Sequence, residues 1–274
     1  IILIIKLFSN TQLITFSVYG GENFFLISTI FFFLLGLVDD KVNLNPNLKL
    51  LIIIIILSIF LNYNENFIIN VLRFSFMDQT YFLGKYSFVF TILCLSLFIN
   101  AFNMYDGINL QSGSYSIIFF IFFIFKSYNF HFSAFFIFSL ILFLIKNFKT
   151  KSFLGDNGCY ILSFVIGIFI IDLYKQDKIY SDQIFLLMML PGIDMLRLFI
   201  LRIISKRNPF AGDKNHLHHI LLNLTNQNKV FIILFSVKFL IFVSVFFNIN
   251  SIIIFSVTIL IYALLLKKRL TFFW

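Results

Sequence analysis

Long apolar segments recur along the chain and are separated by short polar stretches. A helix that crosses a membrane needs about 20 apolar residues, within a range of about 17–25. The pattern predicts ten spanning helices, at residues 1–19, 23–38, 47–62, 86–102, 113–127, 130–147, 158–174, 183–203, 229–247 and 251–267. The segments lack the alternation that a membrane β-barrel shows. We therefore predict an all-α polytopic transmembrane helix bundle that forms one domain over residues 1–274.

The composition agrees with this prediction. The chain is 60% hydrophobic and 12% charged, and its mean hydropathy is +0.98, whereas a soluble domain carries about 25% charged residues. These values exclude a soluble enzyme, a disordered protein and a nucleic-acid-binding module. The 43 phenylalanines fit a lipid-facing surface, an aromatic ligand channel or the bias of an AT-rich genome, and we favour the first and third explanations together.

The distribution of positive charge predicts the orientation in the membrane. The net charge is +9, and 13 of the 21 Lys and Arg residues fall near 39–49, 146–157, 202–229 and the C-terminus from 267. The loops of the opposite face hold five. Because Lys and Arg concentrate in cytoplasmic loops, the richer face is predicted to be cytoplasmic. The chain begins with Ile1 inside an apolar stretch, so we expect an incomplete N-terminus rather than a signal peptide.

Acidic residues stand where predicted spans meet the cytoplasmic face. Asp39 and Asp40 close the second span, and adjacent carboxylates near lipid need a cation or a raised pKa. The alternative is a solvated helix end. Asp156 lies between two glycines before the seventh span, where a helix N-terminus attracts either this carboxylate or a phosphate.

A polar stripe closes the fourth span. Asn100, Asn103 and Asp106 are spaced i, i+3, i+6, which puts them on one side of a helix, and Gly107 is suited to end that helix. The stripe favours a cation or substrate site, with polar packing between helices as the alternative.

Two further groups carry polar chemistry. Asp194 and Arg197 lie inside the eighth span and are spaced to form an ion pair. The pair could have a functional or a structural role. Pro191-Gly192, just before it, predicts a kink or a break in the helix. The longest cytoplasmic loop contains Asp213, Lys214, His216, His218 and His219. Their spacing does not match a zinc-enzyme helix, and next to boundary aspartates we favour a phosphate-binding loop.

Together these groups predict an active site at the cytoplasmic membrane surface. Hard carboxylates suit Mg²⁺, which proteins hold with one or two carboxylates and substrate phosphates. Basic and imidazole groups suit phosphoryl oxygens. We expect a phosphorylated or nucleotide donor and a lipid acceptor.

The motifs occur in the order and on the face typical of one family. Residues 35–40, 100–107, 153–156 and 209–219 resemble those of the polyprenyl-phosphate N-acetylhexosamine-1-phosphate transferases. That family initiates O-antigen, lipopolysaccharide, teichoic-acid and other cell-wall glycans and is related to translocase I of peptidoglycan synthesis. The resemblance implies about eleven spans, so this chain would lack the first. The chain departs from the family at Asn109-Leu110-Gln111, where Asp-Gly-Leu is usual.

The resemblance implies a reaction and roles for the residues. A UDP-linked amino sugar would give its sugar-1-phosphate to undecaprenyl phosphate and release UMP, at the cytoplasmic face of the bacterial inner membrane. Mg²⁺, with Mn²⁺ as an alternative, would be held by Asp156. Asp39, Asp40 and Asp106 would be catalytic. Substrate would be bound by Asn100, Asn103, Lys214, His216, His218 and His219. No nucleic-acid partner is expected, and a homodimer is left open.

Two rival hypotheses remain open from the sequence. A transporter would place ionisable residues near the bilayer midplane, often in broken helices, as Asp194 and Arg197 partly suggest. The other rival is an inactive, truncated member of the family.

Overall fold

The computed structural model describes residues 22–208 and 215–267. The first predicted span (1–19) and the candidate residue Lys214 lie outside this part of the chain. Asp213 and the motif residues 209–212 also lie outside it, and all other candidate residues lie inside it.

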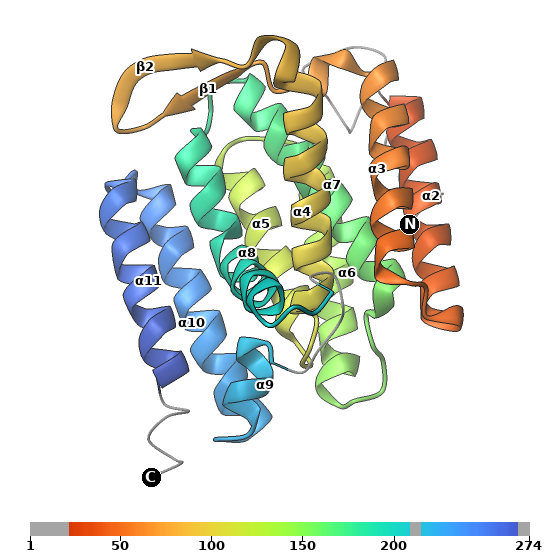
Figure 1. Ribbon diagram of the computed structural model, residues 1–274, viewed down its shortest axis with the longest axis vertical. Helices are drawn as coiled ribbons and strands as arrows, with labels where there is room; N and C mark the ends of the chain where they lie inside the picture. The colour runs from red at the N-terminus through yellow and green to blue at the C-terminus, as the bar shows by residue number, and fades with distance from the viewer. Residues whose placement is uncertain (1–21, 209–214, 268–274) are drawn as a thin grey trace.

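Within the described residues the chain is built mainly of helices (Figure 1). They are α2 (Glu22–Val42), α3 (Pro46–Tyr63), α4 (Ser87–Tyr105), α5 (Gln111–Phe125), α6 (Phe130–Phe148), α7 (Gly155–Lys175), α8 (Ser181–Ile204), α9 (Leu217–Leu222), α10 (Gln227–Phe246) and α11 (Ser251–Lys267). Each of the nine predicted spans from 23–38 onward coincides with one of these helices. In the described part of the chain, six helices are long and apolar enough to cross a membrane, and α5 and α11 are shorter apolar helices. The prediction of a polytopic transmembrane helix bundle is therefore confirmed.

Helix α7 forms the centre of the bundle. Its residues from Cys159 to Tyr174 are all buried, as expected for a helix that is apolar on every side. Helix α2 packs closely against it at Gly36, where an added Cβ would lie 2.1 Å from the Asn157 Cα. This close approach brings the end of α2, which carries Asp39 and Asp40, to the beginning of α7.

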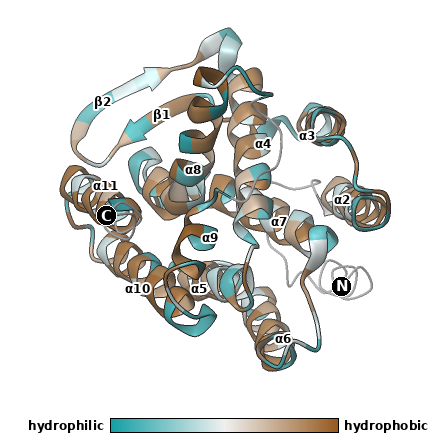
Figure 2. Cartoon of the chain, turned by 60° about the horizontal axis from the view of Figure 1, so that its bottom comes forward, coloured by the Kyte–Doolittle hydropathy of each residue, from teal (hydrophilic) through white to brown (hydrophobic). Residues whose placement is uncertain are grey.

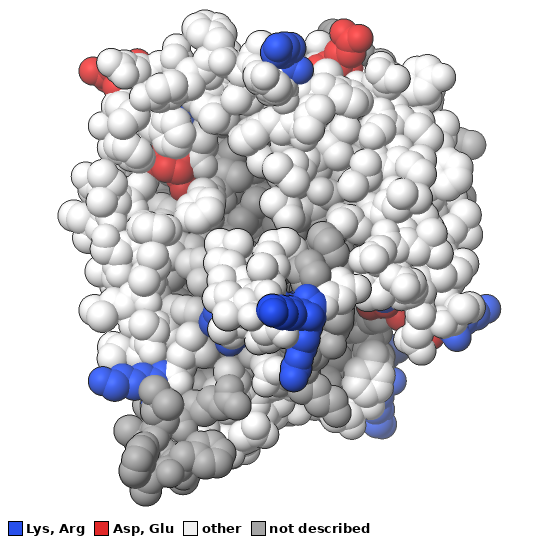
Figure 3. Space-filling view, viewed as in Figure 1, with Lys and Arg blue, Asp and Glu red and all other residues white. Residues whose placement is uncertain are grey.

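The helices run up and down the bundle, so distant loops meet at its two ends. The ends of α2, α4 and α8 and the beginnings of α3, α5, α7 and α10 share one end with α9 (Figures 1 and 2). Apolar residues predominate along the helices, and α9 lies across the centre of this end (Figure 2). Most of the Lys and Arg side chains visible in Figure 3 lie toward the same end.

Two features differ from the sequence prediction. A β-hairpin of β1 (Val71–Phe74) and β2 (Met77–Phe82) lies at the opposite end, flanked by the short 3₁₀ helices η1 (Glu65–Phe67) and η2 (Gly84–Tyr86). Its tip is tied to α8 because Asp182 accepts hydrogen bonds from the Ser75 main-chain N–H and hydroxyl. Helix α8 continues through Pro191-Gly192, so of the two predicted alternatives, a kink or a break, the break is wrong. The surrounding helices pack against α8 and can support it across the missing hydrogen bond.

Candidate active site

The beginning of α7 is capped by a carboxylate from α2. The Asp40 Oδ1 atom accepts a hydrogen bond from the Asp156 main-chain N–H at 2.8 Å, and Oδ2 accepts one from Asn157 N–H at 3.5 Å. Gly155 precedes them with φ of +68°, and a Cβ there would lie 2.8 Å from the Asp40 carboxylate. The helix N-terminus therefore binds Asp40, which leaves the Asp156 side chain available for other contacts.

Lys49 lies between the two remaining carboxylates. Its ammonium is 2.7 Å from Asp39 Oδ2 and 3.9 Å from Asp156 Oδ2. Asp39 is fully buried and also accepts hydrogen bonds from the Tyr160 hydroxyl at 3.0 Å and the Leu44 N–H at 3.0 Å. The sequence predicted that a cation or a raised pKa must accompany the adjacent acids Asp39 and Asp40, and Lys49 is a cation that pairs with Asp39. We call Asp39, Asp40 and Asp156 the acid cluster.

The polar stripe on α4 divides into two parts. Asn103 donates to the Tyr160 hydroxyl at 3.4 Å and so joins the acid cluster through Tyr160. Asn100 donates to the Ser96 carbonyl one turn earlier on α4, a bond within its own helix. The structure brings Asn103 to the cluster and does not show Asn100 in contact with it.

Asp106 begins the loop between α4 and α5. We call residues 106–110 the Asp106 loop. Burial raises the pKa of the Asp106 carboxyl above its ordinary value, and the neighbouring Ser112 and Cys159 side chains oppose this rise. Because Cys159 is in the first turns of α7, Asp106 lies beside the helix that carries Asp156.

Gly107 connects the Asp106 loop to the histidines. A Cβ added at Gly107 would lie 1.8 Å from the His218 Nε2 atom, so only glycine leaves space for this ring. His218 is 2% exposed, and burial, with the neighbouring His219 and His216, lowers its pKa to about 3. His218 is therefore a neutral imidazole packed against the residue after Asp106.

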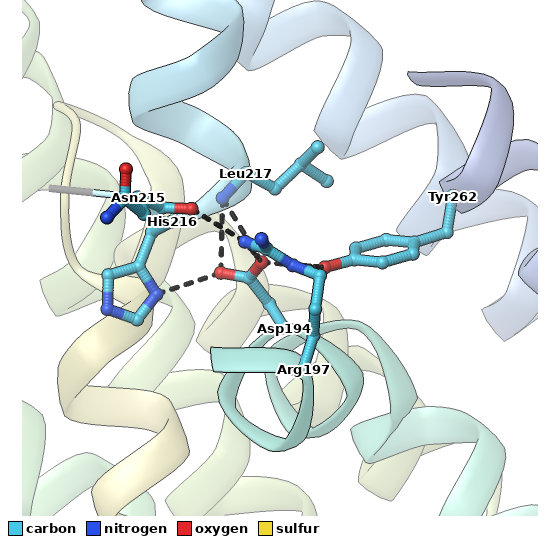
Figure 4. Close-up of polar contacts among 6 residues, drawn as sticks. All are labelled: Asp194, Arg197, Asn215, His216, Leu217 and Tyr262. Carbon is cyan, nitrogen blue, oxygen red and sulfur yellow. Dashed lines mark hydrogen bonds and ion pairs between the residues drawn. The ribbon is translucent and has the colours of Figure 1, made fainter. Parts of the chain in front are cut away.

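Asp194 holds the beginning of the histidine segment, residues 216–219 (Figure 4). Its carboxylate is 2.8 Å from His216 Nδ1 and accepts hydrogen bonds from the Leu217 N–H at 3.1 and 3.2 Å. Arg197 pairs with it at 2.9 Å, and the Tyr262 hydroxyl donates to it at 2.7 Å. The Asp194–Arg197 pair is thus confirmed, and it connects α8, α11 and the segment that leads into α9.

Apart from Asn100, the candidate residues that the structure describes therefore gather at one end of the bundle. The acid cluster and Asn103 are carried by α2, α4 and α7. The histidine segment lies at the beginning of α9 and is held by Asp194 of α8. The Asp106 loop lies next to both. Sequence reasoning missed Tyr160 and Tyr262 as partners, because their contacts join residues that are far apart in the sequence. It also missed Lys49, which is close to Asp39 in the sequence. Of these three residues, only Lys49 had a signal in the sequence, because it is a cation in the first turn of α3, the helix that follows Asp39 and Asp40.

The acid cluster offers one accessible carboxylate to the predicted magnesium ion. Within residues 22–208 and 215–267, no three His, Cys, Asp or Glu side chains converge closely enough to hold a metal ion by themselves. The Asp156 side chain is 30% exposed, lies 3.9 Å from the Lys49 ammonium and interacts with the buried Asp39 carboxyl. One accessible carboxylate beside others fits Mg²⁺ whose remaining ligands come from substrate phosphates and water.

Comparison with known proteins assigns this arrangement to a family. Residues 23–174, more than half of the chain, match the model of glycosyl transferase family 4. The chain belongs to this family of membrane transferases. The matched region contains the acid cluster and the Asp106 loop and ends before the histidine segment.

Two curated relatives cover most of the chain. An undecaprenyl-phosphate alpha-N-acetylglucosaminyl 1-phosphate transferase of Thermotoga maritima is 25% identical over 230 residues, which are 81% of this chain and 69% of that protein. A probable undecaprenyl-phosphate N-acetylglucosaminyl 1-phosphate transferase of Bacillus subtilis is 26% identical over 234 residues, 82% of this chain and 63% of that protein. The family resemblance stated from the motifs is confirmed.

Proposed function

We propose that this protein transfers an N-acetylhexosamine-1-phosphate from a UDP-sugar to undecaprenyl phosphate, releases UMP and so begins a cell-surface polysaccharide. The observation that supports this proposal most is the gathering of the acid cluster, the Asp106 loop and the histidine segment at one end of the bundle. The names of the two relatives support undecaprenyl phosphate as the acceptor.

The chemistry requires two anions to meet. One phosphoanhydride is exchanged for another, so the enzyme mainly has to overcome repulsion and align the attacking and leaving oxygens. In our proposal Asp156 holds Mg²⁺, which would neutralise charge on the diphosphate. Asp39, Asp40 and Asp106 are the other acids near this point, and His219 and Lys214 would contact phosphate or sugar.

Buried residues of the site would act by positioning their neighbours. Asp39 is fully buried and bound to Lys49 and Tyr160, so it would orient the Lys49 ammonium, which would contact phosphate. His216 is held by Asp194, and His218 fills the space at Gly107. Both would fix the position of the histidine segment next to the Asp106 loop.

The charge distribution supports a cytoplasmic active site. The acids of the site lie at helix ends on the face where Lys and Arg are most abundant. Loops rich in Lys and Arg are cytoplasmic in membrane proteins. Transporters place their ionisable sites near the midplane, so this arrangement favours the enzyme. The expected location is the bacterial inner membrane.

The test uses the protein in membrane vesicles with undecaprenyl phosphate, Mg²⁺ and a panel of UDP-sugars, and it measures UMP. We expect UMP from at least one UDP-N-acetylhexosamine and almost none after Asp156→Asn. Asp78→Asn is the matched control, because Asp78 is an exposed residue of β2 at the opposite end. Absence of UMP with every donor would overturn the proposal.

A further inference from the structure

A lysine is buried in the bundle behind the Asp106 loop. Lys238 lies on α10 and is 4% exposed, and none of the ion pairs found among the described residues includes it. Burying an ammonium is costly unless polar groups replace its water. An apolar side chain of similar size would avoid this cost, so the presence of a lysine at this position needs an explanation, which its contacts provide.

The ammonium contacts the residues on both sides of the Asp106 loop. The Nζ atom donates to the Gln111 carbonyl at 3.3 Å. It also lies 4.9 Å from the ring centroids of Tyr105 and of Tyr115, within the range of cation–π attraction. Tyr105 is the last residue of α4 and Gln111 the first of α5. One charged group thus joins the two helix ends between which the loop runs.

The loop needs support from outside its own residues. Leu110 has φ of +70°, a left-handed conformation that costs a non-glycine residue about 1 kcal/mol or more. Its N–H donates to Asn147 Oδ1 at 2.6 Å on α6, and His218 packs against Gly107 from α9. With Lys238, three helices outside α4 and α5 hold the loop in place.

We propose that Lys238 is a positioning residue, which fixes Asp106 relative to Asp156 and the histidine segment by holding both ends of the Asp106 loop. The proposal rests on the proposed transferase function, because the position of Asp106 affects turnover only if Asp106 takes part in the reaction. Lys238 lies outside residues 23–174, so the family match gives it no role.

The test compares Lys238→Met with the native protein. Methionine keeps an unbranched apolar side chain of similar length and removes the ammonium. We expect kcat to fall about 10- to 100-fold, as for a misplaced catalytic group, while KM for both substrates changes less than about twofold. We also expect main-chain hydrogen exchange over residues 106–111 to become about tenfold faster, since these contacts limit local opening. Lys229→Met, an exposed position on the same helix, should change neither quantity.

The two measurements separate the possible outcomes. Unchanged exchange over 106–111, or faster exchange with unchanged kcat, would overturn the positioning role. A raised donor KM with unchanged kcat would also overturn it, by showing that Lys238 binds substrate. If the native protein makes no UMP, the proposed function fails, and the exchange measurement still decides whether Lys238 holds the loop. If Lys238→Met does not fold, Lys238→Gln, which keeps a donor but no charge, decides by the same measurements.

Discussion

Asp40 on α2 and Asp156 on α7 are joined by a hydrogen bond from the Asp156 main-chain N–H to the Asp40 carboxylate at 2.8 Å. The bond caps α7 with a side chain from another helix. It also sets the separation between two of the acids proposed to act in the reaction. The two proposed roles of Asp40, capping α7 and acting on substrate, can be separated with Asp40→Asn, because asparagine caps a helix as well as aspartate does.

The first prediction separates these two roles of Asp40. Asp40→Ala should lower the free energy of unfolding by about 0.5–2 kcal/mol, the usual value of a helix cap, whereas Asp40→Asn should change it little. If Asp40 is catalytic, both variants lose most of their turnover. Thermal unfolding in detergent and UMP release check this, and an Asp40→Asn variant with native turnover would leave Asp40 as a cap alone.

The second prediction concerns the contact between Gly107 and His218. Gly107→Ala should displace the His218 ring, because the new Cβ would lie 1.8 Å from Nε2. Overpacking of this kind costs about 1–3 kcal/mol, and the shift of Asp106 should reduce turnover by about 100-fold. Gly192→Ala is the control, since no atom lies within 4 Å of its Cβ position. Native activity in Gly107→Ala would contradict the described packing.

The third prediction concerns Asp194 as the anchor of the histidine segment. Asp194→Ala leaves Arg197 and His216 without their shared partner, and breaking a buried pair in this way costs about 3–5 kcal/mol. We expect a lower melting temperature and faster hydrogen exchange over residues 215–222. Unchanged exchange in that segment would show that Asp194 does not hold it.

The fourth prediction is a pH dependence from His218. Its pKa is lowered to about 3 by burial, whereas the unfolded chain binds this proton near pH 6.5. The unfolded state therefore binds more protons between these values, so this contribution to stability is present above pH 6.5 and is lost as the pH falls toward 3. By this linkage, acidification from pH 7.5 to 5 should lower the free energy of unfolding by about 2 kcal/mol more in the native protein than in His218→Gln. Equal losses in thermal unfolding would show that His218 is not buried in neutral form.

The spans and the positions of the acids could be predicted from the sequence because both depend on local pattern. Twenty apolar residues in a row specify a spanning helix whatever surrounds them. Asp39, Asp106 and Asp156 stand out because ionisable residues are rare in membrane-spanning segments and these three stand at or near the segment ends. Helices that alternate in direction then place these ends on one face.

The partners of these acids could not be predicted because they depend on packing between distant segments. Tyr160 is 121 residues from Asp39, and His216 is 22 residues from Asp194. The capping of α7 by Asp40 requires the close approach at Gly36, which no local pattern shows. The β-hairpin was missed since its strands have only four and six residues and lie beside stronger apolar patterns.

The most direct test of the proposed reaction follows the β-phosphate of the donor. A UDP-N-acetylhexosamine labelled with ³²P at the phosphate next to the sugar is incubated with the protein in vesicles containing undecaprenyl phosphate. Transfer of the sugar-1-phosphate carries the label into the lipid extract, and Asp156→Asn should prevent this. Label that stays with the nucleotide while sugar appears in lipid, or no transfer with any such donor, would contradict the account.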